Sequence, residues 1–177
     1  MINHRWCVSL FQNIIVIILL ISAAGFLSLT EIALAGARKV KLKILAESGE
    51  IRAQKVLDLQ EQSADFFAAS QIGLNAIAIL GGILGEGAFR PYFVEFVARF
   101  YTGPWLETIG FALSFTLVTS LFILFADLMP KRLAMNAPEK ISIRVIEPIQ
   151  IFIKICKPLA WGINAIANLL FRLFKVN

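Results

Sequence analysis

The feature that most constrains this chain is an uncharged run of 25 residues, Trp6 to Thr30. A helix needs about 20 apolar residues to cross a bilayer, whereas the apolar core of a signal peptide has about 7–15. The run therefore predicts a retained transmembrane helix over residues 10–30. Two further apolar stretches, 66–85 and 108–127, are long enough to cross as well. The sequence predicts an all-α membrane protein with three transmembrane helices.

Composition supports this fold class. The chain is 58% hydrophobic and only 16% charged, whereas soluble domains have about 45–50% apolar and about 25% charged residues. These values exclude a water-soluble globular domain and a disordered chain.

Basic residues predict the topology. Six lie between the first and second spans, in the segment Arg38 to Asp65, and eight more follow Asp127, while the connection Phe89 to Glu107 has two. Loops rich in Lys and Arg face the cytoplasm. We therefore expect the N-terminus outside and the C-terminus in the cytoplasm.

The polar segment after the first span is predicted to be helical. Apolar residues recur among Lys and Glu from Val40 to Leu59, with Ser48-Gly49 as a break, which indicates one or two amphipathic helices on the cytoplasmic membrane face. Charges and prolines interrupt the apolar tail, which favours a bent juxtamembrane helix over a fourth crossing. The predicted division is a transmembrane domain, 1–137, with a helical loop, 38–65, followed by juxtamembrane helices, 138–177.

Gly81 and Gly85 form a GxxxG step at the end of the second span. Small residues at this spacing let helix backbones approach closely. The step is either a homodimer seam or a packing face within one protomer. A chain of three spans favours a dimer.

Ionisable groups inside a membrane are expensive, so each is a candidate functional residue. Glu31, at the end of the first span, shares a helix face with Ser28. The alternative is that Glu31 lies close enough to the interface to reach water or to pair with Arg38 or Lys39.

Asp127 ends the third span and is followed by Pro130. Because proline has no N–H, the Ala126 carbonyl four residues earlier loses its donor, and a helix broken there would offer oxygens to a cation. The alternative is an Asp127–Lys131 pair, with Pro130 merely ending the helix.

The second and third spans add uncharged polar groups. The second contributes Ser70, Gln71, Gly73 and Asn75, whose oxygens could complete a cavity or simply bridge helices. The hydroxyls of the third span are expected to be structural and to bond their own helix: Ser114, Thr116, Thr119 and Ser120. Glu86 and Arg90 are expected to form a surface pair.

No catalytic cluster is visible in the sequence. His4 is the single histidine, Cys7 and Cys156 lie at opposite ends of the chain, and there is no Walker loop. We therefore expect no enzyme activity, no disulfide framework and no structural metal.

Three segments together resemble the transmembrane domain of the CNNM/CorC family of magnesium and cobalt transport proteins. Phe26-Leu27-Ser28-Leu29-Thr30-Glu31-Ile32-Ala33-Leu34 resembles the family's FFSxSExAL segment, Gln71-Ile72-Gly73-Leu74-Asn75-Ala76-Ile77-Ala78 its IGNNLVN segment, and Ala126-Asp127-Leu128-Met129-Pro130-Lys131 its GExxPK segment. Their order and spacing agree over essentially the whole chain.

The resemblance implies a homodimer of three-helix protomers, each with a cytoplasmic juxtamembrane helix and a cation held between the three motifs. Family members usually continue into a nucleotide-binding CBS pair and a further C-terminal domain, which are absent from this chain. We therefore expect no cofactor here, with nucleotide confined to such CBS domains. The expected partners are a small cation, lipid and a second copy, and not nucleic acid. The family's bacterial branch, together with the absence of a transit peptide, implies a bacterial inner membrane.

Departures from the family pattern bear on the substrate. Leu74 and Ala78 stand where the family has Asn, and Ala126-Asp127 stands where it has Gly-Glu. Mg²⁺ demands near-octahedral oxygen coordination, so these changes should weaken a magnesium site. An organic dication could instead place one ammonium near Glu31 and the other near Asp127.

The leading interpretation is an exporter of a small cation, favoured as a polyamine such as putrescine or cadaverine. The alternatives are efflux of a divalent metal and a non-transporting regulator or scaffold. The residues predicted to bind the cation are Ser28, Glu31, Gly73, Asn75, Ala126 and Asp127. Ser28, Glu31 and Asp127 would hold a divalent ion, and Pro130 and Gly73 are candidate hinges for alternating access.

Overall fold

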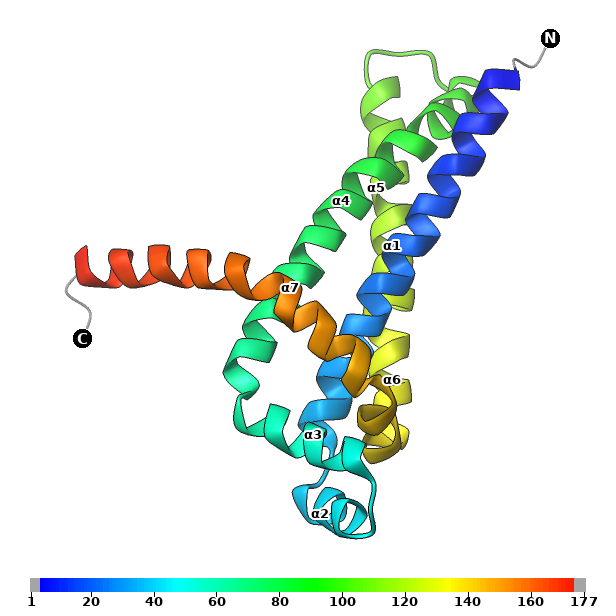
Figure 1. The fold of residues 1–177 in the computed structure, drawn as a ribbon. Coiled ribbons are helices and arrows are strands. Elements are labelled where there is room, and N and C mark those ends of the chain that lie inside the picture. Colours follow the sequence, from blue (N-terminus) through cyan, green and yellow to red (C-terminus); the bar gives the residue numbers. More distant parts are fainter. Residues whose placement is uncertain (1–3, 174–177) are drawn as a thin grey trace. The chain divides into compact units, whose positions relative to one another are not determined.

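The computed structural model describes the backbone of residues 4–173, and the side chains of this range except those of 4–10, 65, 157–161 and 163–173. The described chain is helical almost throughout and contains no strand (Figure 1). The elements in chain order are α1 (His4–Gly36), α2 (Lys39–Glu47), α3 (Ile51–Glu61), α4 (Ser63–Ala98), α5 (Leu106–Leu121), η1 (Phe122–Leu128), α6 (Met129–Asn136) and α7 (Pro138–Leu173).

Three helical stretches are long and apolar enough to cross a membrane: Phe11–Gly36, Phe66–Ala98 and Leu106–Asn136. The prediction of an all-α protein with three candidate spans is therefore confirmed. The third stretch comprises α5, η1 and α6 in direct succession.

The second helix is longer than predicted. The sequence suggested an end near residue 85 and a connection over Phe89 to Glu107, but α4 continues through Pro91 to Ala98. The charge of Arg90 did not mark a helix end, because its guanidinium lies 3.8 Å from Glu86 and 3.1 Å from Glu107. The predicted Glu86–Arg90 pair is thus present, and Glu107 extends it to the start of α5.

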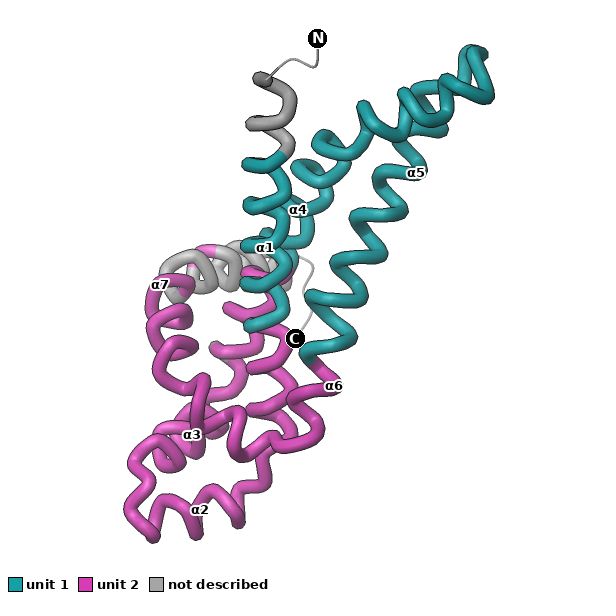
Figure 2. Tube along the Cα trace, turned by 90° about the vertical axis from the view of Figure 1, so that its right-hand side faces the viewer, with its two compact units in different colours: residues 1–26, 75–130 teal, residues 27–74, 131–177 magenta. Residues whose placement is uncertain are grey.

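The chain divides into two compact units, coloured separately in Figure 2. Unit 1 comprises residues 1–26 and 75–130, and unit 2 comprises residues 27–74 and 131–177. The chain passes between the units at 26/27, 74/75 and 130/131, so each passage falls inside or beside one of the three sequence motifs.

Unit 1 is held together by close packing of α4 against α5 and η1. A Cβ atom on Gly81 would overlap the Phe122 ring, and one on Gly85 would lie 2.5 Å from Val118 Cγ1. The GxxxG face is therefore filled by side chains of the same protomer, which favours packing within the protomer over a dimer seam. Ser114, expected to bond its own helix, instead donates to the Glu86 carbonyl of α4 at 2.9 Å.

Unit 2 contains the amphipathic helices. The predicted break falls between α2 and α3, where Gly49 has φ of 100°, a conformation that costs other residues a steric penalty. The α3 helix packs against α7, and both Arg52 and Lys55 lie within ion-pair distance of Glu147, at 3.3 and 3.6 Å. The fully buried apolar side chains of unit 2 include Leu42, Val56, Phe66, Ile146 and Ile149. The α7 helix is continuous over Pro138–Leu173 and changes direction part-way (Figure 1).

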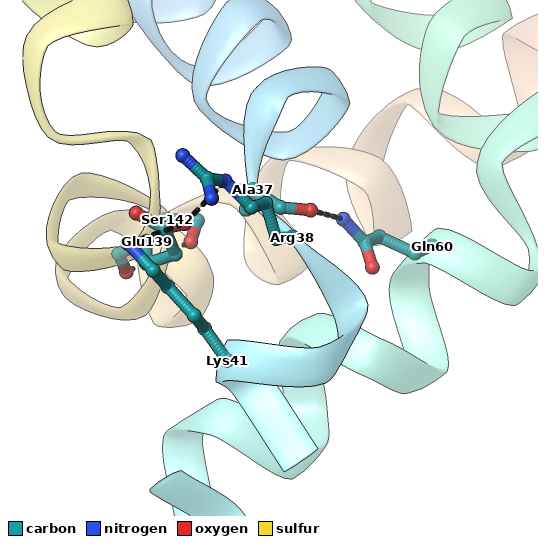
Figure 3. A network of polar contacts seen from close by, with 6 residues as sticks. All are labelled: Ala37, Arg38, Lys41, Gln60, Glu139 and Ser142. Atoms are coloured by element: carbon teal, nitrogen blue, oxygen red, sulfur yellow. Dashed lines mark hydrogen bonds and ion pairs between the residues drawn. The ribbon is translucent and has the colours of Figure 1, made fainter. Parts of the chain in front are cut away.

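A polar network surrounds the end of α1 (Figure 3). Gln60 donates through Nε2 to the carbonyls of Leu34 at 2.7 Å and Ala37 at 3.0 Å. The last carbonyls of a helix lack donors within the helix, and Gln60 supplies the missing hydrogen-bond donor here. Beside it, Glu139 lies 3.4 Å from the Lys41 ammonium and 3.9 Å from the Arg38 guanidinium.

Candidate functional site

The first motif places two polar side chains in the interior of unit 2. Ser28 is fully buried, and Glu31 is 8% exposed. They lie on one face of α1, as their spacing predicted. Burying a carboxylate is costly unless it is hydrogen-bonded or paired, so the surroundings of Glu31 determine what this motif can do.

Gln71 of α4 bonds the Glu31 carboxylate. Its Nε2 donates to Glu31 Oε1 at 2.8 Å. Arg38, one of the expected alternative partners, lies instead beside Glu139. The neutral Gln71 amide donates one hydrogen bond to the Glu31 carboxylate but brings no positive charge. The two carboxylate oxygens of Glu31 therefore remain suited to a cation.

Gly73 allows α4 to approach its neighbours in unit 2. A Cβ atom at this position would lie 3.1 Å from Leu27 Cδ1 and 2.7 Å from Phe152 Cζ. The absence of a side chain therefore brings α4 close to α1 and α7. This close approach positions Gln71, two residues earlier, beside Glu31.

Ser70 adds an unsatisfied group to the same turn of α4. Its hydroxyl is fully buried and has no hydrogen-bond partner among the described residues. Buried polar atoms normally find a partner, so Ser70 is an exception among the described residues.

The third motif adopts a π-helix in unit 1. Residues Phe122–Leu128 form the wider helix, and the Met129 N–H donates to the Leu124 carbonyl, five residues back. We expected Pro130 to break the helix, but the chain stays helical by widening before the proline. π-helical turns occur frequently at functional sites.

This geometry removes the usual donors from one carbonyl. The Phe125 oxygen could pair along a helix with the N–H of Met129 or of residue 130. Met129 already donates to Leu124, and Pro130 has no N–H. An under-satisfied carbonyl therefore lies two residues from Asp127, which is half-buried.

Gly25 provides the space opposite this turn. A Cβ atom there would lie 3.2 Å from Pro130 Cγ and 3.3 Å from the Phe125 oxygen. Even an alanine would press on the π-helix, so the glycine permits α1 and η1 to meet. Ala126 and Pro130 are both buried.

The predicted residues are distributed over both units. Ser28, Glu31 and Gly73 belong to unit 2. Asn75, which is exposed, belongs to unit 1 together with Ala126, Asp127 and Pro130. Within unit 2 the structure brings Glu31 together with Gln71, and within unit 1 it brings Pro130 together with Gly25.

Gln71 is recognisable in the sequence as a polar residue of the second span, but its link to Glu31 is not. The two residues are 40 positions apart, and no local pattern connects them. The signal available in the sequence was the adjacent polar pair Ser70-Gln71 inside an apolar stretch.

Metal-binding clusters and thiols were the remaining candidates for chemistry. Among the described side chains, no group of three His, Cys, Asp or Glu gathers to hold a metal ion. Burial raises the pKa of the Cys156 thiol. The side chain of Cys7 lies outside the described residues.

Comparison with known families places these motifs in context. The cyclin M transmembrane N-terminal domain, abbreviated CNNM, matches residues 14–177. The chain belongs to the CNNM family. The resemblance of its three motifs is thereby confirmed.

Several curated relatives of this CNNM domain are named polyamine export protein. Those of Escherichia coli K12 and Salmonella typhimurium are 49% and 48% identical over 94% of this chain. That of Haemophilus influenzae is 43% identical over 95% of the chain. The chain spans 37–39% of the length of these relatives.

Proposed function

We propose that this CNNM domain forms the membrane-spanning part of an exporter of small organic cations, with a polyamine such as putrescine or cadaverine as substrate. The names of its relatives support this substrate class. Those names describe longer proteins, so the support for the domain itself must come from its own residues.

The observation that carries the proposal is the buried Glu31 carboxylate with its Gln71 partner. Glu31 is 8% exposed within a candidate span, and Gln71 Nε2 bonds one of its oxygens at 2.8 Å. An ammonium group offers only donors and an ionised carboxylate only acceptors. An anionic group held inside a membrane helix is therefore suited to a cationic substrate.

Asp127 supplies the second acid that a diamine requires. One ammonium of the diamine binds Glu31 and the other binds Asp127, with the neighbouring Phe125 and Ala126 carbonyls as further acceptors. Such a substrate does not need the near-octahedral ligand set that Mg²⁺ demands. Ser28 and Asn75 complete the proposed set of polar contacts.

We further propose an assembly and an orientation for the domain. The domain works as a homodimer in a bacterial inner membrane, with its N-terminus outside and with α2, α3 and α7 at the cytoplasmic face. Alternating access uses Gly73 and Pro130 as hinges. Basic residues in α2 and α3 support this orientation.

Counterflow of labelled putrescine in proteoliposomes tests the function. We expect uptake by the purified chain and its loss in Glu31→Gln and in Asp127→Asn, each still inserted and helical. Glu61→Gln, an exposed position in α3, is the matched control and should transport normally. Transport of Mg²⁺ alone would favour metal efflux, and wild-type flux equal to that of empty liposomes would favour a regulator or scaffold.

A further inference from the structure

The ring of Phe152 occupies the space beside Gly73 that a side chain of α4 would fill. A Cβ atom built on Gly73 would lie 2.7 Å from Phe152 Cζ and 3.5 Å from Phe152 Cε2. Carbon atoms in favourable contact are about 3.5–4.0 Å apart, so the ring leaves no room for a side chain here. Leu27 Cδ1 of α1 would lie 3.1 Å from the same Cβ atom. The helices α1, α4 and α7 therefore meet at Gly73, and all three residues belong to unit 2.

Phe152 makes this contact from a helix that is also held by α3. Ile149, one turn before Phe152, is fully buried. Glu147 of α7 lies 3.3 Å from the Arg52 guanidinium and 3.6 Å from the Lys55 ammonium of α3. Packing and ion pairs thus fix α7 against α3, and Phe152 carries the position of α7 to α4.

Gly73 is two residues from the amide that bonds the buried acid. Gln71 Nε2 donates to Glu31 Oε1 at 2.8 Å. Hydrogen bonds weaken steeply when they are stretched or misaligned, so the position of this turn of α4 determines whether Gln71 reaches Glu31. Gly73 has no side chain of its own to pack, and the turn therefore takes its position from the Phe152 and Leu27 side chains that contact it.

We propose that Phe152 is a positioning residue through which α7 sets the cation affinity of Glu31. The contact of the ring with Gly73 keeps Gln71 within hydrogen-bond distance of the carboxylate. A shift of α7 away from α4 releases this turn and leaves Glu31 without its donor. Phe152 acts through Gln71 and not by contact with the cation. The choice of an organic cation as ligand rests on the proposed function, whereas the link between Phe152 and the Glu31–Gln71 bond does not.

The side-chain amide signal of Gln71 in an NMR spectrum tests this link without any substrate. After isotopic labelling of the glutamine side chains, the Gln71 signal is the one that disappears in Gln71→Leu. A carboxylate acceptor moves an amide proton downfield, so we expect Phe152→Ala to shift the Gln71 signal towards the signals of exposed glutamines. Ile151→Ala, at a position of the same helix that is 61% exposed, is the control and should leave the signal in place. An unchanged Gln71 signal in Phe152→Ala, or an equal shift in Ile151→Ala, would overturn the proposal.

Calorimetric titration with putrescine measures the consequence for affinity. We expect Phe152→Ala to raise the Kd about fivefold, as residues that act on a site without touching its ligand can do. Ile151→Ala should bind like wild type. A wild-type Kd in Phe152→Ala would overturn the effect on affinity. If wild type itself does not bind putrescine while the Gln71 signal still shifts in Phe152→Ala, the proposed function fails and the link between Phe152 and Gln71 stands.

A double substitution tests the contact at Gly73. Gly73→Ala places a methyl group 2.7 Å from Phe152 Cζ, which forces the ring aside and should also displace the Gln71 signal. In the double variant with Phe152→Ala, the new methyl group fills part of the space that the ring leaves. We therefore expect the signal shift and the rise in Kd to be smaller than the sum of the two single effects, as is usual for residues in contact. Additive effects, in variants that retain the wild-type circular dichroism spectrum, would contradict a contact at Gly73.

Discussion

Among single residues, Gln71 is the one that holds the Glu31 carboxylate in place through a hydrogen bond. Gln71→Leu removes the donor 2.8 Å from Glu31 Oε1. Without this donor the Glu31 carboxylate is no longer held in one orientation, so we expect the Kd for putrescine to rise about tenfold. Gln12→Leu, at an exposed position of α1, is the control. Calorimetry that finds the same affinity in both variants would remove Gln71 from the site.

A second residue, Glu139, makes stability depend on pH. Its backbone N–H and the nearby Lys41 hold the pKa of this carboxyl below the usual 4.5. A carboxyl with a lowered folded-state pKa stabilises the fold above its unfolded pKa, and this contribution is lost as the pH falls through the folded-state value. Glu139→Gln should therefore lower the unfolding midpoint near neutral pH, with a difference from wild type that shrinks below pH 4.5. A difference that stays constant over this range would contradict the assignment.

At the scale of helices, packing of α4 against α5 depends on one particular glycine. Gly85→Ala would place Cβ 2.5 Å from Val118 Cγ1. Valine is stiff at χ1, and Val118 is 1% exposed, so it has little room to yield. We expect a loss of about 1–3 kcal/mol of stability, recovered in part by Val118→Ala.

Gly82 is the matched control on the same helix, because nothing lies within 4 Å of a Cβ built there. Replacing glycine by alanine in a helix normally stabilises it, so Gly82→Ala should unfold at or above the wild-type midpoint. Equal destabilisation by the two substitutions in thermal unfolding would show that the contact of α4 with α5 does not depend on Gly85.

The helices also show how far sequence reasoning reaches. The α2–α3 pair and its break at Ser48-Gly49 follow from local periodicity, and both are present. The extension of α4 beyond Gly85 was missed because the charge of Arg90 is matched by Glu107, 17 residues later. The π-helix could not be predicted from the sequence, because a proline such as Pro130 is compatible both with a helix break and with a widened turn. Contact with Gly25 is not visible in the local sequence.

At the scale of the whole molecule, the basic loop predicts one orientation. In a background without Cys7 and Cys156, Ser48→Cys reports on the α2–α3 turn and Thr102→Cys on the connection between α4 and α5. The positive-inside rule places the first in the cytoplasm and the second outside. A membrane-impermeant maleimide added to intact cells should therefore label only Thr102→Cys. Labelling of Ser48→Cys alone would show that the domain has the opposite topology.

Binding of an organic dication by the acidic residues of the spans underlies the proposed function. Calorimetric titration with cadaverine and, separately, with Mg²⁺ tests this binding, using the purified wild-type chain and Asp127→Asn. We predict that cadaverine binds wild type, that Asp127→Asn loses this binding, and that Mg²⁺ gives no comparable heat. Binding of Mg²⁺ without cadaverine, or undiminished cadaverine binding by Asp127→Asn, would contradict the account.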